Sequence, residues 1–241
     1  MAVQFVKNEN TFQVHNGDRH ATVHFPTDRL AYLKAPAEAM RATIDNVVTD
    51  ATRTAKRFSD DAFATEVLPV LNPLFVVARD LQKEAVSRKA HLETLKADLL
   101  DFPVDPVKAD SIRQSLRGVE PVKIFSLAFK DPEINAAVLA MPTLFGLTPD
   151  LIAKLESALI QANWERKFAN QEQPKHATLD DLIPVGPDLA LVKQRAGDAM
   201  LNFENSQAEL VLTEQLLSGV INFAAVTASL SPVEIFNKIG F

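Results

Sequence analysis

The sequence of 241 residues contains no cysteine. Disulfide bonds, thiolate metal ligands and a cysteine nucleophile are therefore excluded, and the stability of the fold must come from packing. Glycine is scarce, with seven residues, and tyrosine and tryptophan occur once each. Few glycines together with many Ala, Leu and Val residues favour helices over a turn-rich β sandwich. The expected fold class is mainly α.

Motifs for nucleotide or acyl chemistry are missing as well. The chain contains no Gly-x-Gly-x-x-Gly, no Gly-x-x-x-x-Gly-Lys and no Gly-x-Ser-x-Gly, so neither a phosphate-binding loop nor a nucleophile elbow is predicted. The formal net charge of −6 disfavours nucleic acid and anionic membranes as partners. We therefore expect no cofactor and no nucleic-acid partner.

Targeting and membrane signals are also lacking. Residues 1–7 carry no basic region followed by an apolar run, as a secretory signal peptide would. The most apolar stretches, 67–78 and 216–230, are shorter than the roughly 20 residues that cross a bilayer. We expect no secretion by a signal peptide, no stable membrane span, and a location in the cytoplasm or within a phage particle.

The first 25 residues alternate between apolar and polar side chains. Two turn-forming stretches, 7–10 and 16–19, divide them into three short segments. The alternation predicts a three-stranded antiparallel β meander over 1–25 with one apolar face, formed by Val3, Phe5, Phe12, Val14, Ala21, Val23 and Phe25. Three short strands need further packing, so we expect this meander to cap a helical body.

From residue 36 the apolar period changes to that of a helix. One stripe predicts a helix over 36–58, and near-heptad stripes predict two long helices over 74–100 and 187–217. These helices indicate a bundle that occupies 36–241. The polar stretch 169–187 is the longest irregular connection and the expected hinge or exposed loop.

Prolines mark the expected ends of several helices. An Asp, Thr or Ser directly before a proline predicts a capped helix start at Asp105, Asp131, Thr148 and Ser231. Pro69 and Pro73 lie within an otherwise helical pattern. Because proline removes a backbone donor and clashes with the preceding turn, we expect a break or kink there.

Histidines and paired carboxylates are the residues that could carry metal or acid–base chemistry. On the polar face of the meander, His15 should face His20, with His24 farther along the third strand. These three are weak metal candidates, because His24 is too distant to share an ion; no native metal site is expected. His91 and His176 lie beside no obvious nucleophile. The acidic pairs are Asp60 with Asp61, Asp98 with Asp101, and Asp180 with Asp181. The first and the last of these follow a Ser or Thr that could start a helix, so helix capping explains them best.

The end of the chain is apolar. Ser231, Pro232 and Glu234 predict a helix start with a capping box. The following apolar residues are the predicted interaction residues, docked on the chain itself or on a partner: Ile235, Phe236, Ile239 and Phe241. The stretch 121–125, PVKIF, resembles 232–236, PVEIF. The similarity is explained either by chance or by two similar docking segments.

The sequence favours a non-enzymatic helical assembly protein: a structural, adaptor or scaffolding subunit of a bacterial or phage-type complex. Its expected partners are proteins, in a homo- or hetero-oligomer. A free sheet edge and an apolar helical end are common means of joining subunits. One alternative is a membrane-active, pore-forming protein that releases 67–78 or 209–230. Another is an enzyme or ligand binder with a dispersed site under the 169–187 loop.

Overall fold

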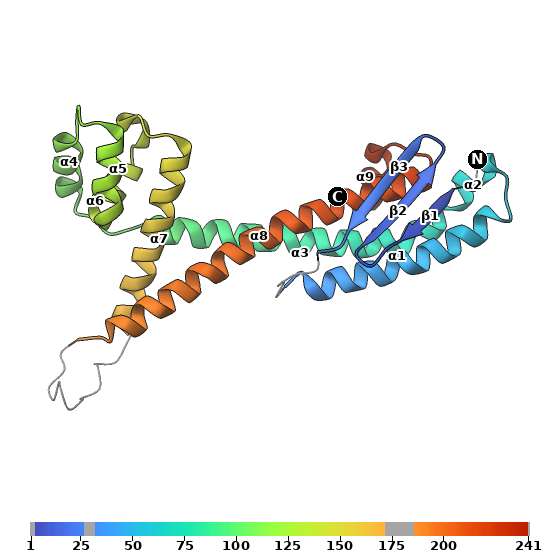
Figure 1. Ribbon diagram of the computed structural model, residues 1–241, viewed down its shortest axis with the longest axis horizontal. Helices are drawn as coiled ribbons and strands as arrows, with labels where there is room; N and C mark the ends of the chain where they lie inside the picture. The colour runs from blue at the N-terminus through green and yellow to red at the C-terminus, as the bar shows by residue number, and fades with distance from the viewer. Residues whose placement is uncertain (1–2, 27–31, 172–185, 241) are drawn as a thin grey trace. The chain divides into compact units, whose positions relative to one another are not determined.

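The computed structural model describes residues 3–26, 32–171 and 186–240. Of the residues that the structure describes, 75% are helical, and a three-stranded antiparallel sheet at the N-terminus is followed by long helices (Figure 1), which confirms the predicted fold class. Two compact units share the chain: unit 1 consists of 1–90 and 205–241, and unit 2 of 91–204. The division falls inside two helices, α3 (Leu68–Leu100) and α8 (Leu189–Thr227).

Unit 1 contains the sheet and the core that covers it. Its strands are β1 (Gln4–Lys7), β2 (Thr11–Asn16) and β3 (Arg19–His24). Its helices, besides the parts of α3 and α8, are α1 (Lys34–Ala55), α2 (Asp60–Glu66) and α9 (Pro232–Ile239). Buried side chains from all of these helices and from β2 and β3 belong to one apolar cluster.

The sheet has the order β1-β2-β3, with both pairs antiparallel. The predicted alternation is confirmed, because Phe12, Val14 and Val23 are buried in the core of unit 1. The Phe5 ring lies 6.0 Å from that of Phe223 in α8. At Gly219 of α8, a Cβ atom would lie 3.4 Å from the carbonyl oxygen of Thr22. A methyl group at this position would make an ordinary van der Waals contact with β3, whereas a larger side chain would have to displace the strand.

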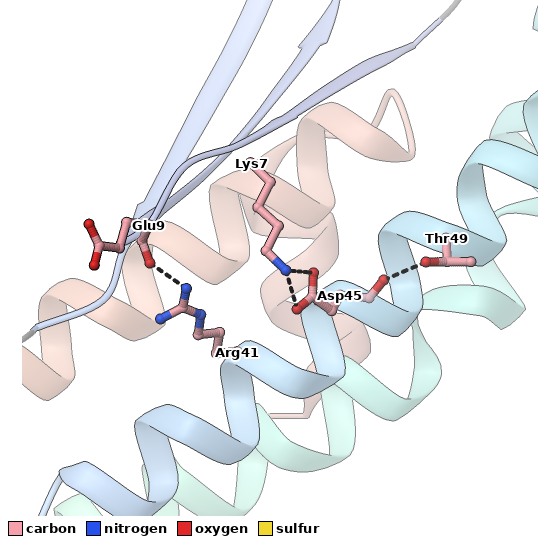
Figure 2. A network of polar contacts seen from close by, with 5 residues as sticks. All are labelled: Lys7, Glu9, Arg41, Asp45 and Thr49. Atoms are coloured by element: carbon pink, nitrogen blue, oxygen red, sulfur yellow. Dashed lines mark hydrogen bonds and ion pairs between the residues drawn. The ribbon is translucent and has the colours of Figure 1, made fainter.

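Polar contacts tie the meander to α1 (Figure 2). Lys7 Nζ lies 2.7 Å from each carboxylate oxygen of Asp45, and the Arg41 guanidinium donates to the carbonyl of Glu9. The Thr49 hydroxyl donates to the Asp45 carbonyl one turn earlier in the helix. The ion pair is exposed, so it contributes at most about 1 kcal/mol. These contacts orient the meander on α1, while the buried side chains supply most of the stability.

The helices of unit 1 follow the predicted stripes with some corrections. In α1 the stripe residues Met40, Ile44, Val47 and Ala51 are buried, whereas Phe58 lies beyond the helix end and is exposed. The helix break expected at Pro69 or Pro73 lies slightly earlier in the chain. Helix α2 ends at Glu66, α3 begins at Leu68, and α3 continues through Pro73. Pro73 lies on the exposed side of α3, where water can satisfy the carbonyl that loses its partner.

The long helix α8 exceeds its predicted range of 187–217 and runs to Thr227. Phe203 is buried as expected, but Leu210 is only half-buried, and its neighbour Glu209 is buried instead. The predicted heptad stripe of α3 is confirmed at Leu74, Ala78 and, within unit 2, Leu99.

Unit 2 contains the end of α3, the start of α8 and the shorter helices that lie between them in the sequence. These shorter helices are α4 (Pro106–Ser115), α5 (Pro121–Lys130), α6 (Pro132–Leu139), the 3₁₀ helix η1 (Pro142–Phe145) and α7 (Pro149–Gln171). Asp105 and Asp131 accept backbone hydrogen bonds at the starts of α4 and α6, as their sequence predicted. The buried Asn163 donates to the carbonyls of Leu99 and Asp101, which fixes the C-terminal end of α3 on α7. Most of the expected hinge, 172–185, lies outside the described residues.

Candidate interaction surface

The predicted interaction residues of the C-terminus lie on the short helix α9. Ser231 and Glu234 form the predicted capping box: the Ser231 hydroxyl accepts from the Glu234 backbone N–H, and the Glu234 carboxylate accepts from the Ser231 backbone N–H. The hydrogen bonds that the Glu234 carboxylate accepts from the Ser231 backbone N–H and from the Ser231 hydroxyl lower its pKa. Ile235 and Ile239 are fully buried in the core of unit 1, whereas Phe236 is exposed. Phe241 lies outside the described residues.

Side chains from distant parts of unit 1 hold the turn before α9. Asn16, at the end of β2, donates to the Val226 carbonyl at 3.0 Å and to the Ser229 hydroxyl at 2.9 Å. Arg19, at the start of β3, donates to the Leu230 carbonyl. These contacts join the hairpin of the meander to the connection between α8 and α9. The C-terminal helix is therefore positioned by the N-terminal sheet.

The far end of α9 is fixed by α3. Arg79 Nε donates to the carbonyl of Ile239 at 2.8 Å, and Gly240 ends the helix in the left-handed conformation, with φ of 79°. Such a glycine is the usual way to stop a helix without strain. Together with the burial of both isoleucines, these contacts dock α9 on its own unit.

The outward side of α9 carries the polar residues Glu234, Asn237 and Lys238, but it also exposes two apolar side chains. Val233 is 68% exposed and Phe236 lies three residues later, so the two share one helix face. An amphipathic helix that buries one apolar side normally presents polar residues on the other. Helix α9 follows this pattern, with Val233 and Phe236 as two exposed apolar residues among polar ones.

Helix α5 of unit 2 repeats this arrangement. Its residues Ile124 and Ala128 are buried in the core of unit 2, while Val122 is 72% and Phe129 is 55% exposed. The rings of Phe125 and Phe129 lie 5.6 Å apart. We call Val122, Phe125 and Phe129 the α5 apolar face. The likeness between 121–125 and 232–236 thus extends to structure: proline starts each helix, valine is exposed and isoleucine is buried.

The histidines of the meander adopt the predicted register. His15 and His20 are directly opposite each other on β2 and β3, with their rings stacked 6.2 Å apart. His24 pairs with Thr11 instead. His91 is exposed on α3, and His176 lies outside the described residues. Within the ranges that the structure describes, no group of three or more His, Asp or Glu side chains could hold a metal ion.

The paired carboxylates have separate positions. Asp60 and Asp61 form the start of α2, and Asp98 precedes the end of α3 at Leu100 while Asp101 follows it. Asp180 and Asp181 lie outside the described residues.

One polar cluster in unit 1 was not predicted. The buried Glu209 of α8 accepts a hydrogen bond from the backbone N–H of Tyr32 at 3.2 Å, and Arg88 of α3 lies 3.9 Å from its carboxylate. The Arg88 guanidinium lies over the Tyr32 ring and also pairs with Glu84. The signal in the sequence was Arg88 itself, which interrupts the apolar stripe of α3 and so needs an acidic partner.

Two helical stretches, 62–100 and 189–227, are long and apolar enough to cross a membrane by length and composition alone. Of their most apolar windows, 33% and 50% are buried inside the protein. The expectation of no membrane span was based on the short apolar runs 67–78 and 216–230 alone. The helices α3 and α8 begin or end well outside these runs, so their full length was not foreseen. Partly buried core helices pass the same criterion, so it does not distinguish a membrane helix from a core helix.

Comparison of the chain with models of protein families, with curated proteins and with solved structures finds no match.

Proposed function

We propose that the chain is a non-enzymatic helical assembly protein, a structural, adaptor or scaffolding subunit of a bacterial or phage-type complex. The observation that supports this proposal is the α5 apolar face. Val122 and Phe129 are 72% and 55% exposed on a helix whose other side is already buried in unit 2. An apolar helix face of this kind suits helix-in-groove or helix-on-helix docking.

Exposed aromatic and branched side chains gain free energy when a partner covers them. Burying an exposed Val or Phe contributes roughly 1.5–3 kcal/mol for each fully buried side chain. Aromatic residues are enriched at the centres of protein interfaces, where a few side chains carry most of the binding energy. The Phe125–Phe129 pair is already formed in the single chain, so little side-chain entropy is lost when a partner covers it.

The surroundings of this face favour a protein partner. Lys123 and Lys130 are exposed on the same helix, and they would form the polar rim of an interface. The chain carries a net charge of −6, so in a head-to-tail contact these lysines of one copy can meet acidic side chains on a different surface of the other copy. We therefore propose self-association through the α5 apolar face.

Sedimentation velocity over a range of protein concentrations tests the proposal. We expect the native chain to associate with increasing concentration and Phe129→Asp to remain monomeric, because the aspartate would have to lose its water in the interface. Val107→Asp is the matched control: Val107 is 78% exposed on α4 of the same unit, outside the α5 apolar face. Far-UV circular dichroism must show that both variants fold.

Two outcomes contradict self-association. One is a native chain that stays monomeric throughout the concentration range, and the other is an assembly that Phe129→Asp leaves unchanged. Equal disruption by Val107→Asp would point to a general effect of added negative charge, and this result also argues against the proposed face.

A second candidate function is membrane activity of the pore-forming kind, with which the length and composition of 62–100 and 189–227 are compatible. Its test is the leakage of dye from liposomes across a range of pH. If the native chain and Phe129→Asp cause the same dye leakage at the same protein concentration, membrane activity is favoured over assembly through α5.

A further inference from the structure

The outward face of the meander carries a row of potential ligands across all three strands. The register places Gln4 of β1 opposite His15 of β2, and His15 opposite His20 of β3. All three side chains are exposed. The opposite face of the sheet carries the buried core residues, so this row is held on a rigid support.

The two imidazoles are close enough to share a metal ion once their side chains rotate. Their ring centroids lie 6.2 Å apart, with 23° between the ring planes. An ion bound tetrahedrally at about 2.0–2.1 Å from two nitrogens needs those nitrogens about 3.3 Å apart. Directly opposite residues have Cβ atoms only about 4.5–5.5 Å apart, so rotation of the two side chains brings one nitrogen of each ring to that separation without moving the backbone.

The charges around the row do not oppose a cation. On the outward face the strand residues near the imidazoles are neutral: Gln4, Val6, Thr11, Gln13 and Thr22. The basic strand residues have other partners, because Lys7 pairs with Asp45 and Arg19 donates to the Leu230 carbonyl. Asp18, in the turn between the two strands, adds a nearby negative charge.

We propose that His15 and His20 form a two-imidazole site for a late first-row transition-metal ion, with the remaining coordination positions open to water. Imidazole nitrogen suits Cu²⁺, Ni²⁺ and Zn²⁺, and Cu²⁺ binds most tightly of these. The chain has no cysteine, so no thiolate competes for the ion. Gln4 lies in the same row, where its amide oxygen can approach the ion as a further ligand.

His24 is excluded from the site by the register. It lies on the same face of β3, four residues from His20, which corresponds to about 13 Å along a strand. One ion cannot bind both side chains at that separation. His24 therefore provides a matched control on the same face of the same strand.

Isothermal titration of the full chain with CuCl2 and with ZnCl2 tests the proposal. We expect one Cu²⁺ per chain, bound more tightly than Zn²⁺. His15→Ala and His20→Ala should each lower the affinity for Cu²⁺ by at least about tenfold, which is the smaller loss found when only a residue that supports a metal ligand is replaced. His24→Ala should bind as the native chain does. Binding should weaken as the pH falls, because the ligand imidazoles must be neutral. Electron paramagnetic resonance of the Cu²⁺ complex should show two equivalent imidazole nitrogens.

Several results would overturn the site. These are the absence of saturable Cu²⁺ binding, binding that His15→Ala leaves unchanged, or an equal loss in His24→Ala. Because both histidines are exposed, their replacement should leave the fold intact, and matching circular dichroism spectra without metal must confirm this. Self-association through α5 can fail without affecting any of these readouts.

Discussion

Replacing Ile235 by alanine tests whether α9 is an integral part of unit 1. Ile235 is fully buried in a core that also contains residues of the sheet and of α8. The substitution removes buried methyl and methylene groups and leaves a cavity, because the surrounding side chains relax only partly. For Ile→Ala at a site of this kind, we expect the free energy of unfolding to fall by about 2–5 kcal/mol.

The chain offers a convenient pair of probes for this measurement. Urea unfolding followed by far-UV circular dichroism reports on both units, whereas the fluorescence of Trp164, the single tryptophan, reports on unit 2. Ile235→Ala should move the dichroism transition to lower urea. If the two units unfold independently, the fluorescence transition should keep its midpoint; if they unfold together, both transitions should move.

Val233→Ala is the matched control. It also removes a β-branched side chain from α9, so the change in helix propensity is similar, but Val233 is 68% exposed. Its effect should remain within about 0.5 kcal/mol. The docking of α9 on its own unit would be refuted if Ile235→Ala left the urea midpoint of the dichroism transition unchanged, or if both substitutions lowered that midpoint equally.

Three further predictions concern single contacts. Asn163→Ala removes the donor to the Leu99 and Asp101 carbonyls and should destabilise unit 2 by about 1–3 kcal/mol, seen as a lower urea midpoint of Trp164 fluorescence; an unchanged midpoint argues against this clamp. Gly219→Val should lower the melting temperature far more than Gly219→Ala, because only the larger side chain must displace the backbone of β3 at 3.4 Å. The folded pKa of Glu234 lies below its ordinary value of 4.5, so its contribution to stability is present above pH 4.5 and is lost as the pH falls through the lower, folded value; Glu234→Gln should flatten this part of the stability–pH curve, and an identical curve would contradict it.

Features that depend on neighbouring residues were predicted well. The strands of the meander follow from alternation and from two turn sequences, and their register follows from the short turn at 16–19. The starts of α4, α6 and α9 follow from a capping residue before a proline. In each case the deciding interactions lie within a few residues, so the sequence alone contains them.

Features that depend on tertiary packing were predicted less well. The sequence suggested that Pro73 would interrupt a helix, but the buried Leu71 and Leu74 hold α3 against the core on either side of it. The division into two units has no counterpart in composition, because it falls within the continuous helices α3 and α8 rather than in a linker.

The candidate surfaces were predicted only in part. The apolar character of 235–239 and the similarity of 121–125 to 232–236 are visible in the sequence. The helical period cannot determine which apolar residues of a short helix face the core when apolar residues lie on more than one side. Only the structure separates the buried Ile124 and Ile235 from the exposed Val122 and Val233.

The pairing of Arg88 with Glu209 explains how charged residues can lie in the apolar stripes of two long helices. Arg88 follows Leu81 and precedes Leu92 in the stripe of α3, and Glu209 is buried on α8. A buried charge is costly unless it is paired, so these residues restrict the alignments of the two helices in unit 1. A shift of α8 by one turn, about 5.4 Å, would leave Glu209 buried away from Arg88. An apolar pair would allow such a shift at lower cost, because leucines in neighbouring turns can substitute for one another in the seam. The polar pair therefore selects one register of α3 against α8, and with it the position at which Gly219 meets β3.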